Sequence, residues 1–80
     1  MKIKVRLFGA FRNYGNGSLL EVELDPGATV AALREALRVH VKEPRLLSDS
    51  AFADETAVLI DAQVLRDGTT VAVLPPVCGG

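Results

Sequence analysis

Residues 2–8 read Lys-Ile-Lys-Val-Arg-Leu-Phe, and this stretch decides the fold because charged and apolar side chains alternate along it. Successive side chains of a β-strand point to opposite faces of a sheet, so the alternation predicts a half-buried strand. The two faces divide as follows: Ile3, Val5 and Leu7 inward, and Lys2, Lys4, Arg6 and Phe8 outward. A sheet with one apolar face needs a second layer to cover it.

The alternation resumes at residues 19–24, where Leu20, Val22 and Leu24 are separated by two glutamates. Between the two runs, residues 13–18 read Asn-Tyr-Gly-Asn-Gly-Ser. An Asn-Gly pair tolerates the positive φ of a tight hairpin, so the first two strands are predicted to pair as a hairpin.

A helix is predicted to follow. Residues 25–28, Asp-Pro-Gly-Ala, end the strand, and Thr29 stands where an N-cap side chain accepts a backbone N–H of the first helical turn. Apolar residues then recur at the spacing of one helical face until Pro44 excludes continuation. They are Val30, Leu33, Leu37 and Val41. This predicts about three turns packed on the sheet.

The second half is predicted to return to the sheet. Residues 45–55 lack a clear period and predict an irregular segment with a helical turn around Leu46 and Leu47. The remaining elements are a buried strand at 56–60, a turn at 61–62, a short edge segment at 63–65, a turn at 67–68 and a strand at 70–74. The order ββαβ(β)β predicts an α+β fold, with a mixed sheet covered on one side by the helix.

Length and charge restrict the function. Eighty residues make one small domain, without room for a deep catalytic cleft. Nine Lys and Arg against ten Asp and Glu form no basic stripe, so nucleic acid is not an expected partner. No apolar run approaches the ~20 residues of a membrane span and no signal-peptide pattern is present, so a cytoplasmic protein is expected. One cysteine and one histidine predict neither an internal disulfide nor a metal site.

The end of the chain, residues 74–80, reads Leu-Pro-Pro-Val-Cys-Gly-Gly. Two prolines stop the strand and project an extended arm without ladder hydrogen bonds. Gly79 and Gly80 have no side chain, so they can enter a channel as narrow as a bare backbone. A frayed terminus is the alternative. The combination of strand, Pro-Pro and Gly-Gly favours a working arm whose chemical handle is the carboxylate of Gly80.

Two stretches resemble the MoaD/ThiS family of ubiquitin-like sulfur carriers, and most closely its molybdopterin synthase small subunits. They are residues 7–12, Leu-Phe-Gly-Ala-Phe-Arg, and residues 65–80, which run from Leu65 to the final Gly-Gly. The resemblance implies a β-grasp domain over residues 1–74 and a flexible arm over residues 75–80.

The resemblance also implies a chemistry. An E1-like enzyme of the MoeB/ThiF type uses ATP and Mg²⁺ to adenylate Gly80, and a sulfur donor then displaces AMP to leave a thiocarboxylate. The arm inserts into a large subunit of the MoaE type and delivers sulfur to a pterin precursor for the molybdenum cofactor. The chain itself is implied to bind no cofactor and to have no autonomous active site.

Particular residues match the family's contact positions. Phe8, Arg12 and Leu74 match positions at which relatives meet the activating enzyme and the synthase, and strand parity independently places Phe8 and Leu74 outward. The residues implied to enter the partner's channel are Pro75, Pro76, Val77, Cys78 and Gly79. Ordinary surface exposure, and a solvated loop charge at Arg12, are the alternatives.

The sequence departs from the family's pattern at three places. Residues 61–65 are shorter than usual, and Thr69-Thr70 replaces an acidic pair. Cys78 replaces a small inert residue, so its thiol could form a mixed disulfide with a partner or could be merely a small tail residue. His40 and the pair Asp54-Glu55 complete no recognisable site and are interpreted as structural and solvated, respectively.

The acceptor of the sulfur therefore stays open. Thiamine, cysteine, a thiolated tRNA base or a siderophore-like metabolite are alternatives to molybdopterin. A ubiquitin-like modifier conjugated to lysines through Gly80 and a passive interaction module are alternatives of a different class.

Overall fold

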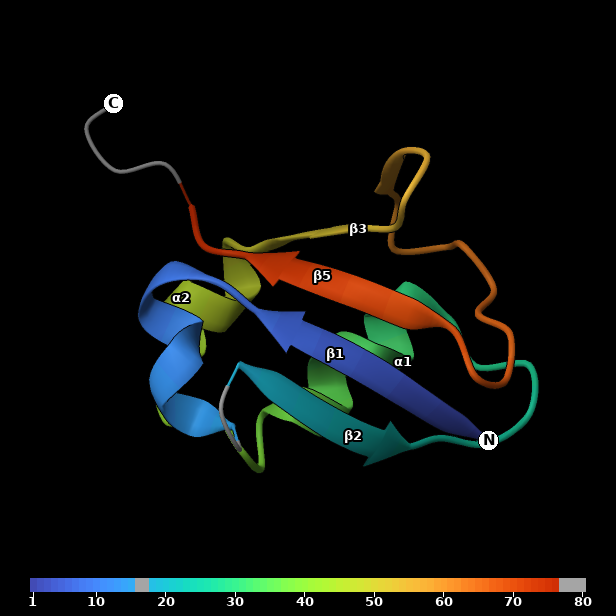
Figure 1. The fold of residues 1–80 in the computed structure, drawn as a ribbon, viewed down its shortest axis with the longest axis horizontal. Helices are drawn as coiled ribbons and strands as arrows, with labels where there is room; N and C mark the ends of the chain where they lie inside the picture. Colours follow the sequence, from blue (N-terminus) through green and yellow to red (C-terminus); the bar gives the residue numbers. More distant parts are fainter. Residues whose placement is uncertain (16–17, 77–80) are drawn as a thin grey trace.

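A five-stranded mixed sheet carries its helices on one face in the computed structural model, which describes residues 1–15 and 18–76 (Figure 1). The elements are β1 (Lys2–Leu7), the 3₁₀ helix η1 (Gly9–Tyr14), β2 (Leu19–Glu23), α1 (Val30–Leu37), α2 (Pro44–Ser48), β3 (Ala51–Ala53), β4 (Val58–Leu59) and β5 (Thr70–Leu74). The strands lie in the order β2-β1-β5-β3-β4. The predicted α+β class, with a mixed sheet covered on one side, is confirmed.

The centre of the sheet is the pair β1 and β5, which run parallel in the register Val5↔Val71 and Leu7↔Val73. All four of these side chains are at most 1% exposed, so the predicted alternation of β1 and the predicted strand at 70–74 are confirmed. The inward residues of the sheet join those of the helices in one core: Ile3, Val5, Leu7, Phe11, Val22, Val30, Leu33, Leu37, Val41, Leu47, Phe52, Leu65, Val71 and Val73.

The first two strands pair antiparallel, as the hairpin prediction requires. Their connection is more than a tight turn, however, because the 3₁₀ helix η1, which was not predicted, occupies Gly9–Tyr14. Phe11 is fully buried and anchors this helix in the core. Asn16 and Gly17, the predicted turn pair, lie outside the described residues.

The helix α1 begins as predicted, because the Thr29 hydroxyl accepts a hydrogen bond from the Ala32 N–H at 3.3 Å. The prediction of three turns up to Pro44 was wrong, since α1 ends at Leu37. The β-branched Val39 and Val41 are poor helix formers, and the N–H of Val41 bonds the Leu37 carbonyl at 2.8 Å in a closing turn. Val41 is nevertheless buried, as its place in the apolar pattern suggested.

The segment before β5 differs most from expectation. The helical turn around Leu46 and Leu47 is confirmed as α2, but the rest of residues 45–55 is not irregular, because Ala51–Ala53 forms β3 with Phe52 fully buried. The buried strand predicted at 56–60 was also wrong. Only Val58–Leu59 forms a strand, β4, and it lies at the edge of the sheet, where Val58 remains 70% exposed.

The connection to β5 agrees with the sequence in outline. Val64 forms an isolated antiparallel bridge with Thr29, so the short edge segment pairs with the chain before α1 and not with the main sheet. The predicted turn at 67–68 is present, and Gly68 adopts a φ of +80° there. Across residues 1–15 and 18–76 no helix has the length and apolar character to span a membrane.

Candidate functional site at the end of the last strand

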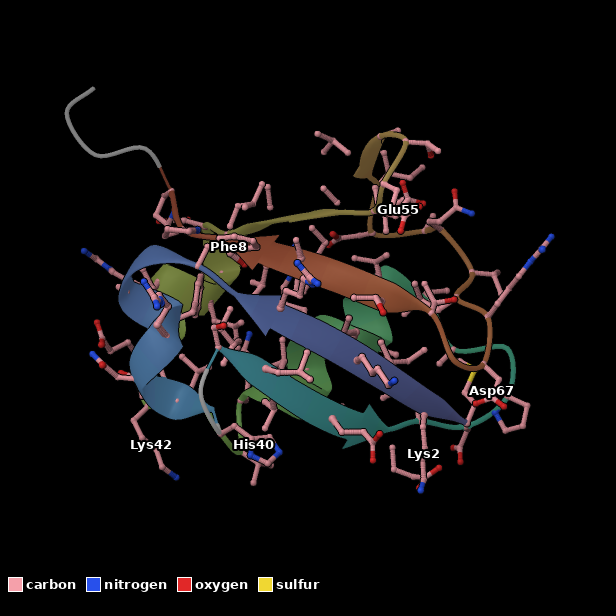
Figure 2. The ribbon with its side chains drawn as sticks, in the orientation of Figure 1. Lys2, Phe8, His40, Lys42, Glu55 and Asp67 are labelled. Carbon is pink, nitrogen blue, oxygen red and sulfur yellow. The ribbon has the colours of Figure 1, made fainter. Side chains whose placement is uncertain are left out.

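Parallel pairing brings the ends of β1 and β5 to the same edge of the sheet. The register Leu7↔Val73 directs Phe8, which follows β1, and Leu74, the last residue of β5, to neighbouring positions. Figure 2 shows Phe8 beside the end of β5, where the chain leaves the sheet towards the C-terminus. Phe8 is 43% exposed and Leu74 is half-buried, whereas Leu7 and Val73 are buried, which agrees with the outward parity of the first two. Partner binding at these residues stays a prediction.

Where the chain leaves the sheet after β5, Pro75 lies in close contact with Gly9 of η1. Gly9 adopts a φ of +56°, a conformation that residues with a Cβ rarely adopt. A Cβ built on Gly9 would lie 2.7 Å from Cγ of Pro75, so the backbone of Gly9 packs directly against the proline ring. The structure therefore gives Gly9 two requirements, a backbone conformation and a close approach, and both position Pro75 at the base of the arm.

The helix η1 holds Arg12 on the same side of the molecule. Phe11 is buried beneath η1, and a hydrogen bond from the Tyr14 hydroxyl to the Glu43 carboxylate ties its far end to the segment before α2. This hydrogen bond raises the pKa of Tyr14, because the carboxylate stabilises the protonated phenol. Arg12 is exposed in the last turn of η1.

A shallow hollow lies next to these residues. It has a volume of about 480 Å³, and its exposed lining comes from Arg6, Phe8, Gly9, Arg12, Ser18 and Leu19. The sequence did not predict four of these lining residues, Arg6, Gly9, Ser18 and Leu19. A signal existed for Leu19, because it is an apolar residue in phase with Glu21 and Glu23 on the polar face of β2.

The structure describes only the first two residues of the predicted arm, Pro75 and Pro76. Pro75 and Pro76 are half-buried and are the last residues that the structure describes. Val77, Cys78, Gly79 and Gly80 lie outside the described residues, so the division into a domain over 1–74 and an arm over 75–80 stays a prediction, as does the role of each of these four residues.

The rest of the described surface offers little chemistry of its own. Within residues 1–15 and 18–76, no group of three or more His, Cys, Asp and Glu side chains could hold a metal ion. His40 is exposed just after α1. Asp54 closes a turn, and hydrogen bonds from Thr56 and from the Ala57 N–H lower the pKa of Asp54. Within the described residues, the predicted contact residues Phe8, Arg12 and Leu74 therefore lie near Pro75, the first residue of the predicted arm.

The sequence matches the model of the ThiS family over residues 5–80, nearly its whole length. The chain belongs to the ThiS family. No sequence among the curated proteins matches this ThiS-family chain significantly.

Solved structures agree with this membership. A protein from Pyrococcus furiosus described as molybdopterin converting factor subunit 1 is 28% identical, with a TM-score of 0.78 over 95% of this chain and 98% of its own. The Caldiarchaeum subterraneum ubiquitin is also 28% identical, with a TM-score of 0.70 over 100% of this chain and 98% of its own. A complex of subunits 1 and 2 of the molybdopterin-converting factor from Helicobacter pylori contains a chain 26% identical, with a TM-score of 0.68 over 100% of both chains.

These findings settle the fold and the broad type of protein. The ThiS-family chain has the ubiquitin-like β-grasp fold, in which the mixed sheet packs on one main helix. Its fold is that of the MoaD/ThiS-type sulfur carriers, as the two matching stretches of sequence predict.

Proposed function

We propose that this protein carries sulfur as a thiocarboxylate on Gly80 and donates it to molybdopterin synthesis. The observation that carries the proposal is the family match, which runs through the C-terminal arm to residue 80. The geometry at Pro75 supports it, because the arm starts from a packed base beside an exposed phenylalanine. A reactive terminus delivered to other enzymes needs both a fixed base and a surface for docking.

The chemistry would proceed in two steps. The carboxylate of Gly80 attacks ATP to give an acyl adenylate and pyrophosphate, and the activating enzyme supplies the nucleotide and Mg²⁺ sites. A donor that supplies sulfur at the oxidation level of sulfide then attacks the carbonyl carbon and expels AMP. The product is a thiocarboxylate, a sulfur nucleophile held on a protein. Under this proposal the protein acts as a carrier and as a non-catalytic small subunit.

The molybdopterin assignment rests on two relatives. The Pyrococcus furiosus protein is described as a subunit of the molybdopterin converting factor, and the Helicobacter pylori chain is seen in complex with the second subunit of that factor. We therefore propose a large synthase subunit as the partner that receives the arm. Phe8, Arg12 and Leu74 would contact it and the activating enzyme, while residues 75–79 enter its channel.

The test is the intact mass of the protein isolated from its own cells, which also shows whether the native chain ends at Gly80. Exchange of one carboxylate oxygen for sulfur adds about 16 Da. We expect this species with an activating enzyme, ATP and a sulfur donor, and we expect it to disappear when Gly80 is deleted. An unmodified carboxylate under these conditions would contradict the proposal.

A ubiquitin-like modifier is the second candidate, and the 28% identity to the Caldiarchaeum ubiquitin favours it specifically. An acyl adenylate can acylate a lysine amine instead of a sulfur donor, giving an isopeptide bond. This reaction would appear as Gly80-dependent bands of higher mass on a denaturing gel. Such bands without any thiocarboxylate would favour the modifier over the sulfur carrier.

A further inference from the structure

The outer face of β1 carries three cationic side chains, and the residues opposite them on β2 differ at the hollow. Lys2 lies opposite Glu23 and Lys4 lies opposite Glu21 in the β1–β2 register, and the ion pair that forms between these side chains joins Lys2 to Glu21. Arg6, the next outward residue, lies opposite Leu19 instead. Arg6 is therefore the outward cation of β1 that has no carboxylate opposite it on β2.

The two arginines of the hollow have no anionic partner within the described part of the chain. Four ion pairs are present there, and neither Arg6 nor Arg12 takes part in them or in a side-chain hydrogen bond. No carboxylate among the described residues lines the hollow. Phe8 and Leu19 add two apolar side chains that are 43% and 44% exposed.

We propose that this hollow receives a segment of a partner protein in which an aspartate or glutamate stands next to an apolar side chain. The carboxylate would bind Arg6 and Arg12, and the apolar group would cover Phe8 and Leu19. A guanidinium fork suits a carboxylate, and exposed apolar side chains next to it suit the centre of a protein interface. A nucleic acid fits less well, because the net charge is −1 and four of the six exposed lining residues are apolar or small.

This inference deepens the proposed function, because the hollow adjoins the base of the arm and the partner would be an enzyme that handles Gly80. It adds Arg6 and Leu19 to the contact residues. It also assigns the partner an acidic group that the family resemblance does not specify. Arg6 would thus act as a specificity-determining residue.

The experiment compares Arg6→Glu with Lys4→Glu, which makes the same change of charge one outward position earlier on β1, outside the hollow. Binding of the full-length variants to the organism's activating enzyme and to the large synthase subunit is measured as association and dissociation rates. We expect Arg6→Glu to weaken at least one complex by about tenfold, mainly through faster dissociation, whereas Lys4→Glu changes only the association rate. Arg6→Gln should fall between the parent protein and Arg6→Glu.

Circular dichroism checks that all variants fold, which the exposure of both positions favours. Equal weakening by Arg6→Glu and Lys4→Glu in both complexes would show a general effect of charge and would overturn the inference, leaving the proposed function intact. At saturating activating enzyme, Lys4→Glu should acquire the thiocarboxylate as fully as the parent protein does. Absence of a thiocarboxylate from the parent protein would instead overturn the proposed function, and this inference with it.

Discussion

The two strands that neighbour β5 in the sheet, β1 and β3, differ in how much apolar side chain their halves of the sheet bury. On one side, β1 pairs with β5 in parallel over four residues and buries Ile3, Val5 and Leu7 completely or nearly so. On the other side, the pair β3 and β4 contributes only three and two residues, of which Phe52 alone is fully buried and Val58 is 70% exposed. The same central strand thus joins a largely apolar half of the sheet to a thin edge.

Contacts of one polar side chain, Arg34, connect α1 to the edge of the sheet formed by β3 and β4. Nη1 of Arg34, on α1, donates hydrogen bonds to the carbonyls of Leu47 and Ser50 at 2.8 and 2.9 Å, and Nη2 lies 2.8 Å from the Asp61 carboxylate. The guanidinium also stacks over the Phe52 ring, 4.8 Å from its centre. Pro75 and the hollow lie on the half that apolar burial stabilises, so Pro75 should hold its position when the edge is perturbed.

The largest expected difference separates Leu7 from Val58. Leu7→Ala removes buried methyl groups and leaves a cavity, so it should lower the free energy of unfolding by about 2–5 kcal/mol. Val58→Ala alters an exposed side chain and should change this free energy by no more than about 0.5 kcal/mol. Urea unfolding followed by circular dichroism measures both. Similar losses in the two variants would contradict the difference between the halves.

A smaller loss of unfolding free energy is expected when the contact between Gly9 of η1 and Pro75 is disturbed. Gly9 and Gly68 both have positive φ, but a Cβ on Gly68 meets nothing within 4 Å, whereas one on Gly9 meets Pro75. Each alanine variant should therefore lose about 1–2 kcal/mol from the backbone conformation. Gly9→Ala should lose about 1 kcal/mol more from the forced contact.

Pro75→Ala is the control for the additional loss of unfolding free energy in Gly9→Ala, because it removes the Cγ atom that the new methyl group would meet. Introduced together with Gly9→Ala, it should recover most of the additional loss in unfolding free energy. Equal costs at Gly9 and Gly68 would show that Pro75 does not pack on Gly9 in solution.

The same comparison explains what could be predicted from the sequence. β1 and β5 alternate over six and five residues, so local pattern alone identifies them and places Phe8 and Leu74 outward. Thr29 likewise signals its own role as an N-cap. β3 is too short to show a period, and it is a strand because β5 offers Val73 as the partner of Phe52.

The candidate site also depends on pairing between distant residues, which the sequence pattern does not show. The arm was visible as a motif, but the hollow depends on residues that the fold brings together. Arg6 meets Leu19 through the register of β1 and β2, and Gly9 meets Pro75 through the parallel pairing of β1 and β5. Neither contact leaves a periodic signal, because both join residues far apart in the chain.

The polar tether can be tested at Arg34. Arg34→Met keeps an unbranched side chain but removes hydrogen bonds to partly buried carbonyls, so it should cost about 1–2 kcal/mol of unfolding free energy. The Asp61 ion pair adds little to this value, because Asp61 is 59% exposed. Arg38→Met is the matched control, since its pair with Glu35 is exposed on both sides and should contribute less than about 0.5 kcal/mol. An equal loss at both positions would show that Arg34 is not a tether.

The turn between β3 and β4 should give the smallest effect, and a dependence on pH. Hydrogen bonds from Thr56 and Ala57 stabilise the charged form and lower the pKa of Asp54 below its ordinary value of 3.8. The carboxylate therefore contributes stability above the ordinary pKa, and this contribution disappears as the pH falls through the lower pKa of the folded state.

Asp54→Asn keeps an oxygen acceptor for the turn but cannot ionise. The melting temperature of the parent protein should exceed that of Asp54→Asn near neutral pH, and this gap should narrow as the pH falls below the ordinary pKa of 3.8 and through the lower pKa of the folded state. Glu55→Gln removes a neighbouring carboxylate that accepts no hydrogen bond within the described residues, so it controls for the loss of charge alone. A gap of constant size across this range would mean that the turn does not depend on the Asp54 charge, and that apolar pairing of β3 with β5 holds this edge as it holds β1.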